Sequence, residues 1–357
     1  MKSIRVAVVG LGIGQQHIEA YQALSGMFEV VAVSSLEPDI SHRIAKKHQI
    51  PHVCRDLDEI CGMQDVDVVD LCTPPYLHFD QLQQALKAGK HAICEKPLVG
   101  SLKEVDELDD LTRTTGKTIM PIFQYRFGHG VQKLKRLVDL GIAGKAYLST
   151  VEVAWRRRAD YYTVPWRGKW TTELGGTLLS HGVHSLDVLC YVLGTPRKVF
   201  ARAETRVNPV EVEDCLVAVL EMPDGSLASF AITVGSAREL SRHRFCFANL
   251  VAESNVRPYT NSSDPWKFIG DTPEIAEQIQ EALAVFKPGL ESFEGQFEQY
   301  YQAMSGWGDL PVNLEDARRS VEVVTAAYHS VSTGQDVHLP ISNDHPAYAG
   351  WSPQRIQ

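Results

Sequence analysis

A lysine set between a carboxylate and a proline ends an apolar run early in the chain. Residues 91–94 read His-Ala-Ile-Cys and lead into Glu95, Lys96 and Pro97. Because proline confines the residue before it to extended backbone, we expect Lys96 to stand at the end of a strand. A lysine that is partly desolvated at such an edge can donate or accept a proton near neutral pH. The alternative is a solvated lysine in a turn.

A row of polar side chains marks a predicted helix in the second half of the chain. The helix opens at 175–176, continues to about Leu193, and carries Ser180, His184 and Asp187 at positions i, i+4 and i+7. Such a row lies on one helix face, so His184 could point into a cleft with Ser180 or Asp187 orienting its ring. A core histidine satisfied by its neighbours is the alternative.

Two further groups of aromatic and basic residues are candidates for substrate binding. Tyr125 and Arg126 follow the point where the sequence pattern changes, and Trp166 and Arg167 lie in a loop before the histidine helix. Aromatic faces beside polar donors suit sugar rings or carboxylates. The triple arginine at 156–158 near them is more often a solvated surface or an oligomer contact than a substrate clamp.

The elements that position these residues begin with a dinucleotide-type turn. A buried strand, 6–9, runs into Gly10, Gly12, Ile13 and Gly14, and residues 15–24 have helical character. Strand, glycine turn and helix form a pyrophosphate site, because backbone amides and the helix dipole approach the phosphates. The third glycine comes one residue early relative to the common G-x-G-x-x-G fingerprint.

The end of the second predicted strand does not decide between NAD and NADP. The strand spans 29–33, and Ser35 stands where an acid would usually receive the adenosine ribose. Glu37 could serve the ribose, whereas Arg43 could serve a 2′-phosphate.

Strand and helix patterns then alternate up to residue 123. Strand 66–72 precedes Thr73, Pro74 and Pro75, and strand 91–94 precedes Lys96. This alternation predicts a doubly wound parallel sheet, an α/β Rossmann arrangement that binds ligands at the carboxyl ends of its strands. Gly10, Thr73 and Lys96 would share that edge.

The rest of the chain predicts a second domain of α+β type with a large, mostly antiparallel open sheet. Strand patterns at 146–154, 198–206, 215–222 and 227–234 follow one another, and a Pro-Asp-Gly turn joins the last two as a hairpin. We expect a dinucleotide-binding domain at 1–123, a substrate and oligomerisation domain at 124–340, and a tail at 341–357. The Asn-, Ser- and Pro-rich stretch 252–274 is expected to be a long loop.

The amino-acid composition limits the classes of binding partner that we expect. The net charge of −9 over 357 residues opposes binding to nucleic acid or to an anionic membrane surface, so a small molecule is the expected partner. The sequence shows neither a signal peptide nor a long apolar span, which predicts a cytoplasmic protein.

We expect no metal site. The seven cysteines show no C-x-x-C spacing and are expected to be reduced core residues. His181 precedes His184 by three residues, but no third ligand follows at a helpful spacing.

These motifs together resemble the glucose-fructose oxidoreductase, inositol dehydrogenase and rhizopine catabolism (Gfo/Idh/MocA) family. The likeness spans residues 4 to about 340 and rests on the order of several short motifs. These are the glycine turn with His17, Cys72-Thr73-Pro74-Pro75 with His78, Glu95-Lys96-Pro97, Tyr125-Arg126-Phe127, and Gly175-Gly176 through His184 to Asp187.

The resemblance implies a Rossmann domain that binds NAD or NADP, and a second domain that often builds homodimers or homotetramers. It implies a sugar, polyol or inositol substrate, with Lys96 as the acid/base and His184 as its partner, and with Pro97 holding the lysine, for instance through a cis bond. The cofactor residues that it implies are Gly10, Gly12, Ile13, Gly14, Ser35, Thr73, Pro74, Pro75, His78, Glu95 and Lys96.

The sequence departs from the family pattern at one site position. Many members carry an aspartate four residues before the histidine, where this chain has Ser180 followed by His181. Either Lys96 and His184 suffice, or His181 contributes.

The leading hypothesis is hydride transfer between a secondary alcohol carbon and the nicotinamide. The alternatives are a glycosidase that oxidises its sugar transiently with bound NAD, and a non-catalytic cofactor-sensing protein.

Overall fold

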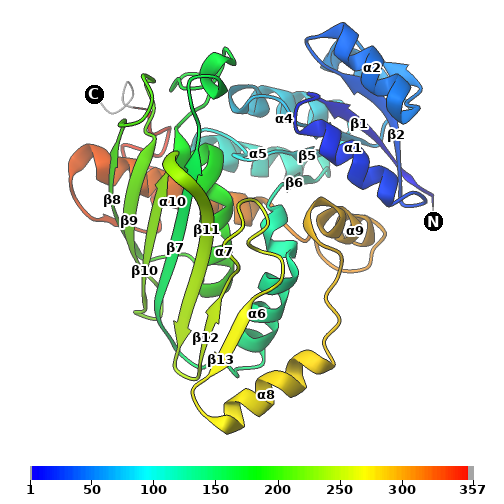
Figure 1. The fold of residues 1–357 in the computed structure, drawn as a ribbon. Helices are drawn as coiled ribbons and strands as arrows, with labels where there is room; N and C mark the ends of the chain where they lie inside the picture. The colour runs from blue at the N-terminus through cyan, green and yellow to red at the C-terminus, as the bar shows by residue number, and fades with distance from the viewer. Residues whose placement is uncertain (1, 353–357) are drawn as a thin grey trace. The chain divides into compact units, whose positions relative to one another are not determined.

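The chain folds into two compact units that are not two consecutive halves of the sequence (Figure 1). The computed structural model describes residues 2–352. The first unit comprises the chain up to Ile122 together with Phe293–Arg318, and the second comprises Phe123–Ser292 and the chain from Arg319 onward. The domain boundaries expected at 123 and 340 do not include this return of Phe293–Arg318 to the first unit.

The first unit is built on a parallel sheet whose strand order is β3-β2-β1-β4-β5-β6. Within the described residues the sheet has six strands, and each neighbouring pair is parallel. Its strands are β1 Ile4–Val9, β2 Phe28–Ser34, β3 His52–Val53, β4 Val68–Leu71, β5 His91–Cys94 and β6 Ile119–Pro121. This is the doubly wound dinucleotide-binding order, with its switch point between β1 and β4, and the predicted α/β class is confirmed.

Helices connect these strands, in agreement with the predicted alternation of strands and helices. They are α1 Gly14–Ala23, α2 Pro38–His48, α3 Leu57–Gly62, α4 His78–Lys87 and α5 Leu102–Thr115. Local signals set their ends: Ser101 accepts a hydrogen bond from the backbone N–H of Glu104, and Gly116 ends α5 in the left-handed region. β1 is buried along Val6–Val9, as expected for a strand covered on both faces.

Helix α9, Ser292–Met304, covers part of the first unit although it comes late in the sequence. Phe297 stacks on Tyr21 of α1 with ring centroids 4.2 Å apart, and Tyr301 meets Phe28 of β2 edge-on. Gln296 donates to the carbonyl of Pro121 at the end of β6. These contacts are the physical reason that the segment returns to the first unit.

The second unit is built on a mixed sheet of order β13-β12-β11-β7-β10-β9-β8-β14, eight strands in the described part of the chain. β7 and β10 are parallel, and the other neighbouring pairs are antiparallel. The predicted open, mostly antiparallel sheet is therefore confirmed. Its strands are β7 Ala146–Arg156, β8 Lys198–Glu204, β9 Cys215–Glu221, β10 Leu227–Thr233, β11 Gly235–Phe247, β12 Leu250–Glu253, β13 Lys267–Gly270 and β14 Val337–His338.

Helices of the second unit include the one that carries the candidate histidine. A π-helical turn, Leu178–Gly182, leads directly into α7, Val183–Leu193. The remaining long helices are α6 His129–Asp139, α8 Pro273–Ala284 and α10 Leu314–Thr333, whose first residues belong to the first unit. The stretch 252–274 is not the uniform loop expected, because β13 lies within it and pairs with β12.

One face of this sheet is exposed and partly apolar. A row of paired residues crosses it from β10 to β13 through Leu227, Leu148, Cys246, Val251 and Ile269. Leu148 and Leu227 are 45% and 47% exposed, and Ile269 is 57% exposed.

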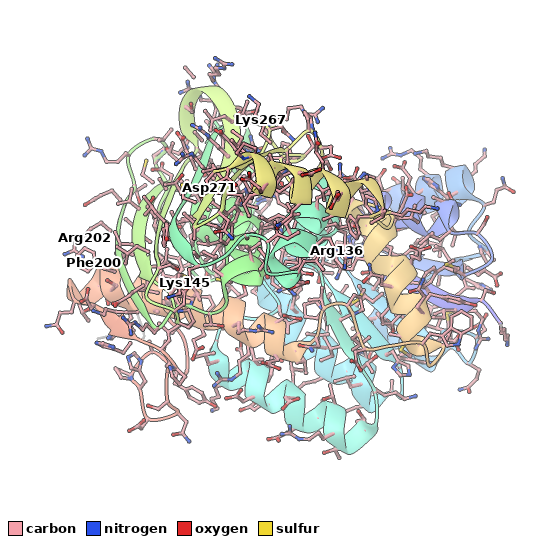
Figure 2. The ribbon with its side chains drawn as sticks, turned by 90° about the horizontal axis from the view of Figure 1, so that it is seen from below. Arg136, Lys145, Phe200, Arg202, Lys267 and Asp271 are labelled. Carbon is pink, nitrogen blue, oxygen red and sulfur yellow. The ribbon has the colours of Figure 1, made fainter. Side chains whose placement is uncertain are left out.

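Charged and aromatic side chains flank this row. Figure 2 labels Phe200 and Arg202 on β8 and Lys267 on β13. The guanidinium of Arg202 lies 4.4 Å from the ring centre of Phe200.

The start of the predicted tail docks on its own unit. Trp351 is buried, its indole N–H donates to the carbonyl of Leu174, and its ring stacks on Tyr328. Residues 353–357 of the tail lie outside the described part. Among the described residues, no helix is both long enough and apolar enough to cross a bilayer.

Candidate active site

The glycine turn after β1 is shaped by close approach of backbone to backbone. Gly10 has φ of +92°, and a Cβ there would lie 2.5 Å from the carbonyl oxygen of Cys72. A Cβ on Gly14 would lie 2.9 Å from Val8 and 3.3 Å from the Cβ of Cys72, so this glycine allows α1 to pack on the sheet. Gly14 therefore performs the packing role of the fingerprint's third glycine although it comes one residue early.

Gly12 differs from its neighbours because a Cβ there would meet nothing within 4 Å. Packing within the chain therefore does not require a glycine at this position. Close approach of a pyrophosphate to the backbone would require one, and Ile13 and Gly14 next to it begin α1. The turn therefore fits the dinucleotide that the sequence predicted.

Ser35, at the end of β2, is engaged within its own loop. Its hydroxyl lies 2.8 Å from that of Ser41 and 3.0 Å from the carbonyl of Glu37. Leu36 between them is 94% exposed. Glu37 is the N-terminal cap residue of α2 and is exposed, as is Arg43 on the same helix.

His78 joins two of the predicted cofactor-binding segments. One ring nitrogen lies 2.8 Å from the carbonyl oxygen of Thr73 and the other 2.9 Å from that of Pro97. The turn of Thr73, Pro74 and Pro75 is thereby tied to the turn that contains Lys96. The hydroxyl of Thr73 also donates to Gln81 of α4.

Lys96 follows β5 at the same sheet edge as the glycine turn. The register pairs Val9 with Leu71 and Leu71 with Cys94, so β1, β4 and β5 end side by side. The Lys96–Pro97 peptide bond is cis, in agreement with what the family resemblance implied. The predicted grouping of Gly10, Thr73 and Lys96 at one edge is thus found in the first unit.

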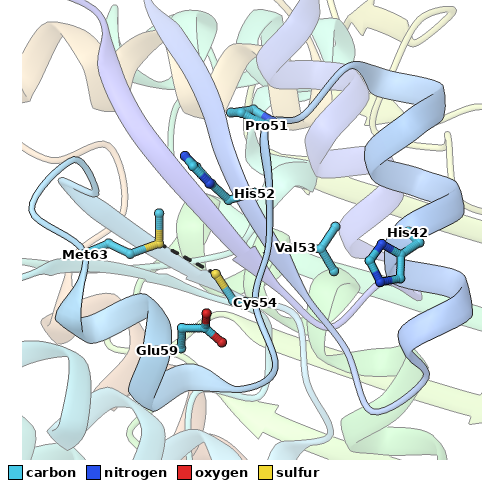
Figure 3. A pocket seen from close by; sticks show the side chains of 7 residues that line it. All are labelled: His42, Pro51, His52, Val53, Cys54, Glu59 and Met63. Carbon is cyan, nitrogen blue, oxygen red and sulfur yellow. Dashed lines mark hydrogen bonds between the residues drawn. The ribbon is translucent and has the colours of Figure 1, made fainter.

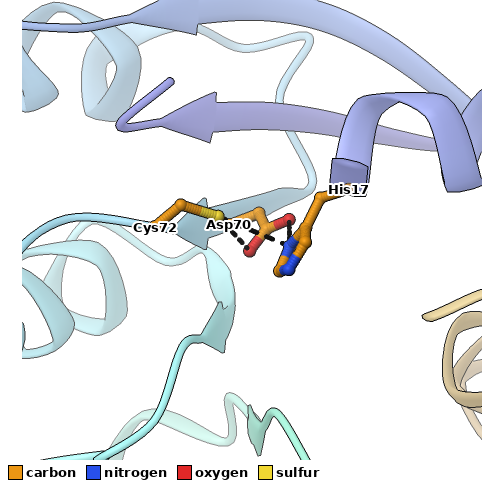
Figure 4. A group of neighbouring side chains, drawn as sticks. All are labelled: His17, Asp70 and Cys72. Carbon is orange, nitrogen blue, oxygen red and sulfur yellow. Dashed lines mark hydrogen bonds and ion pairs between the residues drawn. The ribbon is translucent and has the colours of Figure 1, made fainter. Parts of the chain in front are cut away.

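Behind this edge lies a buried polar cluster of His17, Asp70 and Cys72 (Figure 4). The Nδ1 atom of His17 lies 2.8 Å from a carboxylate oxygen of Asp70, and its Nε2 atom lies 3.2 Å from Glu95. The thiol of Cys72 lies 3.4 Å from Nδ1 of His17. These side chains are of metal-ligating types, but direct hydrogen bonds between them account for the grouping.

In the sequence, His17 stood out only as part of a motif, and Asp70 was not among the predicted site residues. The available signal was Asp70 itself, a carboxylate within an otherwise apolar strand, β4. Such a residue needs a buried partner.

In the second unit, Tyr125 and His184 lie together. Their rings stack with centroids 4.8 Å apart and an interplanar angle of 19°. Both side chains are buried, and burial raises the pKa of the Tyr125 phenol. Tyr125 is therefore a neutral platform for the imidazole.

Asp187 forms a two-pronged ion pair with Arg126. Nε and Nη2 of Arg126 donate to the two carboxylate oxygens at 2.8 and 2.6 Å, and both side chains are buried. The guanidinium also lies 4.8 Å from the ring centre of Tyr191. These contacts give Arg126 a structural role that the sequence pattern did not indicate.

Ser180 and His181 form a chain of hydrogen bonds with Arg157. Nε of Arg157 donates to Nε2 of His181 at 3.1 Å, so Nδ1 of His181 carries the proton and faces the hydroxyl of Ser180 at 2.6 Å. The Ser180 hydroxyl in turn donates to the carbonyl of Gly176 at 2.8 Å. His181 is thus held as the neutral tautomer with its lone pair occupied, which argues against His181 as a general base.

Arg167 is enclosed by aromatic rings. Its guanidinium lies 4.0 Å from the ring centre of Tyr161 and 4.3 Å from that of Trp166, and it pairs with Glu173. Arg157 lies over Trp155 and Tyr161 and also pairs with Glu239. The two arginines therefore belong to one aromatic cluster whose charges are balanced by carboxylates.

A cavity of about 450 Å³ lies at the β3 side of the first unit (Figure 3). None of the predicted site residues lines it. Its lining residues are His42, Pro51, His52, Val53, Cys54, Glu59 and Met63.

Comparison with known proteins identifies the family. Residues 4–123 match the oxidoreductase family with an NAD-binding Rossmann fold, and residues 131–247 match the C-terminal domain of the same family. The chain belongs to the Gfo/Idh/MocA family of oxidoreductases. The resemblance inferred from the motifs is confirmed, as are the predictions of an NAD-type cofactor and of an enzyme.

A related Gfo/Idh/MocA protein is the D-glucoside 3-dehydrogenase of Escherichia coli (strain K12). It is 29% identical over 366 aligned positions, which cover 94% of this chain and 97% of that protein.

Solved structures share the fold of this chain. The WlbA dehydrogenase of Bordetella pertussis, solved with NADH and UDP-GlcNAcA, superposes with a TM-score of 0.85 at 23% identity, covering 96% of this chain and all 100% of that one. Levoglucosan dehydrogenase, solved with NADH and levoglucosan, superposes with a TM-score of 0.80 at 21% identity. The superposition covers 95% of this chain and 100% of that one.

Proposed function

We propose that this protein is an NAD-dependent dehydrogenase that interconverts a secondary hydroxyl and a ketone on a sugar, polyol or inositol-type substrate. The observation that carries the proposal is the register of the first sheet, which sets the glycine turn and Lys96 at one edge. A lysine held there by a cofactor-binding turn is placed to exchange a proton with a substrate on that edge. The activity of the related D-glucoside 3-dehydrogenase supports the substrate class.

The residues that would hold the cofactor are those of the glycine turn, the end of β2 and the turn after β4. Gly12 leaves open space for a pyrophosphate, and the start of α1 adds the positive end of its dipole. Once bound, the nicotinamide supplies the hydride acceptor of the reaction. We propose NAD over NADP because the matched family domain is NAD-binding.

Lys96 serves as the acid/base in this proposal. In the direction of oxidation its neutral amine takes the hydroxyl proton, and in reduction its ammonium returns the proton to the forming alcohol. His184 donates a hydrogen bond to the same oxygen and so stabilises the negative charge that develops on it. The proposal requires both side chains to reach one substrate oxygen.

The other candidates support these two residues. Tyr125 is a stacking platform for His184, and the Arg126–Asp187 pair braces the helix that carries it. Ser180 and His181 hold Arg157, while Trp166 and Arg167 belong to the aromatic cluster suited to a sugar ring.

Location and assembly are also part of the proposal. All seven cysteines lie among the described residues and form no disulfide, which supports the reducing cytoplasm. The exposed apolar row on the second sheet supports a homodimer or homotetramer.

The test is the turnover of Lys96→Ala on a panel of glucosides, polyols and inositols with NAD. We expect NAD affinity within a few-fold of wild type, and a kcat lower by roughly 10²–10⁴. His184→Asn should lower kcat less than Lys96→Ala does. Near-normal turnover by Lys96→Ala would overturn the assignment of the base.

The same panel separates the alternatives left open by the sequence. A glycosidase would cleave sugars without net formation of NADH. A cofactor-sensing protein would bind NAD and turn over no substrate in the panel.

A further inference from the structure

We infer that His17 is a positioning residue for Lys96: it bridges Asp70 and Glu95 as an imidazolium and thereby fixes the turn that carries the lysine. The inference rests on the proposed role of Lys96. It adds a function to a side chain that lies in the first helix of the chain, distant in sequence from Lys96.

The geometry is a continuous chain of contacts from α1 to Lys96. Nδ1 of His17 meets Asp70 at 2.8 Å, and Nε2 of His17 meets Oε1 of Glu95 at 3.2 Å. The second carboxylate oxygen of Glu95 accepts the backbone N–H of Lys96 at 3.1 Å. Glu95 is therefore held on one side by the imidazole and holds the lysine backbone on the other.

The protonation state follows from what each partner can do. A carboxylate only accepts hydrogen bonds, so contact of both ring nitrogens with carboxylates favours a ring that donates from both. Burial of His17 lowers its pKa, but the Asp70 carboxylate, together with Cys72, more than reverses this and leaves the pKa raised well above its ordinary value.

Acidic, thiol, phenol and aromatic side chains from several elements surround the ring. From β4 and the turn after it, Asp70 and Cys72 face His17, and from its own helix Tyr21 donates to Asp70 at 2.9 Å. Phe293 and Phe297 of α9 pack on the ring at centroid distances of 4.4 and 5.3 Å. Cys94, Tyr300 and His78 also interact electrostatically with Asp70 or Glu95.

Two features distinguish this bridge from the hydrogen bonds that any buried polar side chain makes with its neighbours. The His17 side chain is 0% exposed, and one of its two charge-assisted hydrogen bonds goes to Glu95, the residue directly before Lys96. The helix that carries His17 begins at Gly14 in the glycine turn, so the same element contacts both the cofactor-binding turn and the lysine turn.

The first experiment reads the ring directly in the wild-type protein. ¹⁵N NMR of the histidine side chains should show both nitrogens of His17 protonated at pH 7.5. A His17 ring with one protonated nitrogen at pH 7.5 would overturn the imidazolium bridge.

The second experiment measures turnover of His17→Gln beside Tyr21→Phe as its matched control. The control removes a hydrogen bond to Asp70 and leaves the contact between His17 and Glu95 in place. We expect His17→Gln to lower kcat by roughly 10- to 100-fold with the sugar KM within a few-fold, and Tyr21→Phe to stay within about threefold of wild type. Equal losses in the two variants, or an unchanged kcat in His17→Gln, would contradict the inference.

A double variant separates this inference from the proposed function. If His17 acts through Lys96, adding His17→Gln to Lys96→Ala should lower the residual rate little further, whereas a general structural effect would lower it by the same factor as in wild type. Normal turnover by Lys96→Ala would instead refute the proposed function, and the NMR result on His17 would then stand by itself.

Discussion

The ion pair of Arg126 with Asp187 in the second unit is buried, and this burial decides how much each of the two residues matters for stability. The guanidinium and the carboxylate are both removed from water, and their two parallel hydrogen bonds offset the desolvation of each. Loss of one partner leaves the other charge buried, which costs far more than the pair contributes.

We therefore predict that Asp187→Asn lowers the free energy of unfolding by about 3–5 kcal/mol. Urea denaturation at pH 7 measures this change. The control is Asp139→Asn, which breaks the exposed ion pair with Lys135 and should cost under about 1 kcal/mol. Similar losses for the two variants would show that burial does not decide the effect.

A second residue-scale prediction concerns Gly12. A methyl group there meets open space, so Gly12→Ala should keep the melting temperature of wild type. The same methyl would occupy the space that a pyrophosphate needs, and we expect the Kd for NAD to rise at least tenfold, measured by calorimetry.

The matched control is Gly62→Ala, at the end of α3, where an added Cβ also meets nothing within 4 Å. It should change neither stability nor NAD affinity. Wild-type affinity in Gly12→Ala would remove the turn from the cofactor site.

At the scale of elements, the segment before α7 is organised by the carboxyl group of Glu213. Its oxygens accept the backbone N–H groups of Gly176 and Leu178 at 2.9 Å, and the Tyr328 hydroxyl at 3.0 Å. A Cβ on Gly176 would lie 1.8 Å from the Glu213 carbonyl oxygen, which explains this glycine. The π-helical turn and the histidines follow directly.

Glu213 should make stability depend on pH. Burial raises its pKa to about 7, against the hydrogen bonds from Leu178 and Gly176, which lower it. Because the folded pKa lies above the unfolded one, its contribution is fully present below about pH 4.5 and is lost as pH rises through 7.

Through Glu213, the wild type should lose roughly 3 kcal/mol of unfolding free energy between pH 4.5 and 7.5. We predict that Glu213→Gln removes this loss. The measurement is the difference in unfolding free energy between variant and wild type across this range, so that other titrating groups cancel. A difference that does not change with pH would contradict the raised pKa.

Some elements were predictable because their signals are local. β5 was expected at 91–94 and is found there, since four residues of strand character end at a glutamate, a lysine and a proline. The hairpin of β9 and β10 followed from its Pro-Asp-Gly turn. Such signals depend on neighbours in sequence, which the sequence displays directly.

Other elements depend on partners that are distant in sequence. Two of the buried positions of β11 are occupied by the polar residues Ser241 and His243. The alternation of apolar and polar residues in this part of the sequence is therefore weak. These two side chains are satisfied by the indole N–H of Trp155 and by the carbonyl of Ser185, neither of which the sequence pattern could indicate.

The predicted row of Ser180, His184 and Asp187 was also affected by an unforeseen local feature. The π-helical turn at Leu178–Gly182 changes the spacing at its start, and Ser180 bonds Gly176 and His181. A π-helical turn depends on tertiary contacts such as those of Glu213, so the α-helical periodicity assumed from sequence did not reveal it.

At the scale of the whole molecule, the open face of the second sheet supports the predicted homo-oligomer. We predict that Val219→Glu, on β9, shifts the protein toward monomer in analytical ultracentrifugation, because Val219 is 53% exposed on that face and a carboxylate there opposes burial. The control is Val285→Glu after α8, which is 75% exposed. A monomeric wild type, or an equal effect of the control, would contradict the prediction.

The return of Phe293–Arg318 to the first unit also bears on synthesis at the ribosome. The aromatic side chains of α9 that cover His17 and Tyr21 emerge well after Ile122, the last residue of the first segment. At 5–20 residues per second this delay is on the order of 10–30 s, during which the nascent amino-terminal segment lacks part of its cover. Expression of that segment alone should therefore yield an aggregation-prone product, whereas a fusion that carries the later helix should restore its solubility.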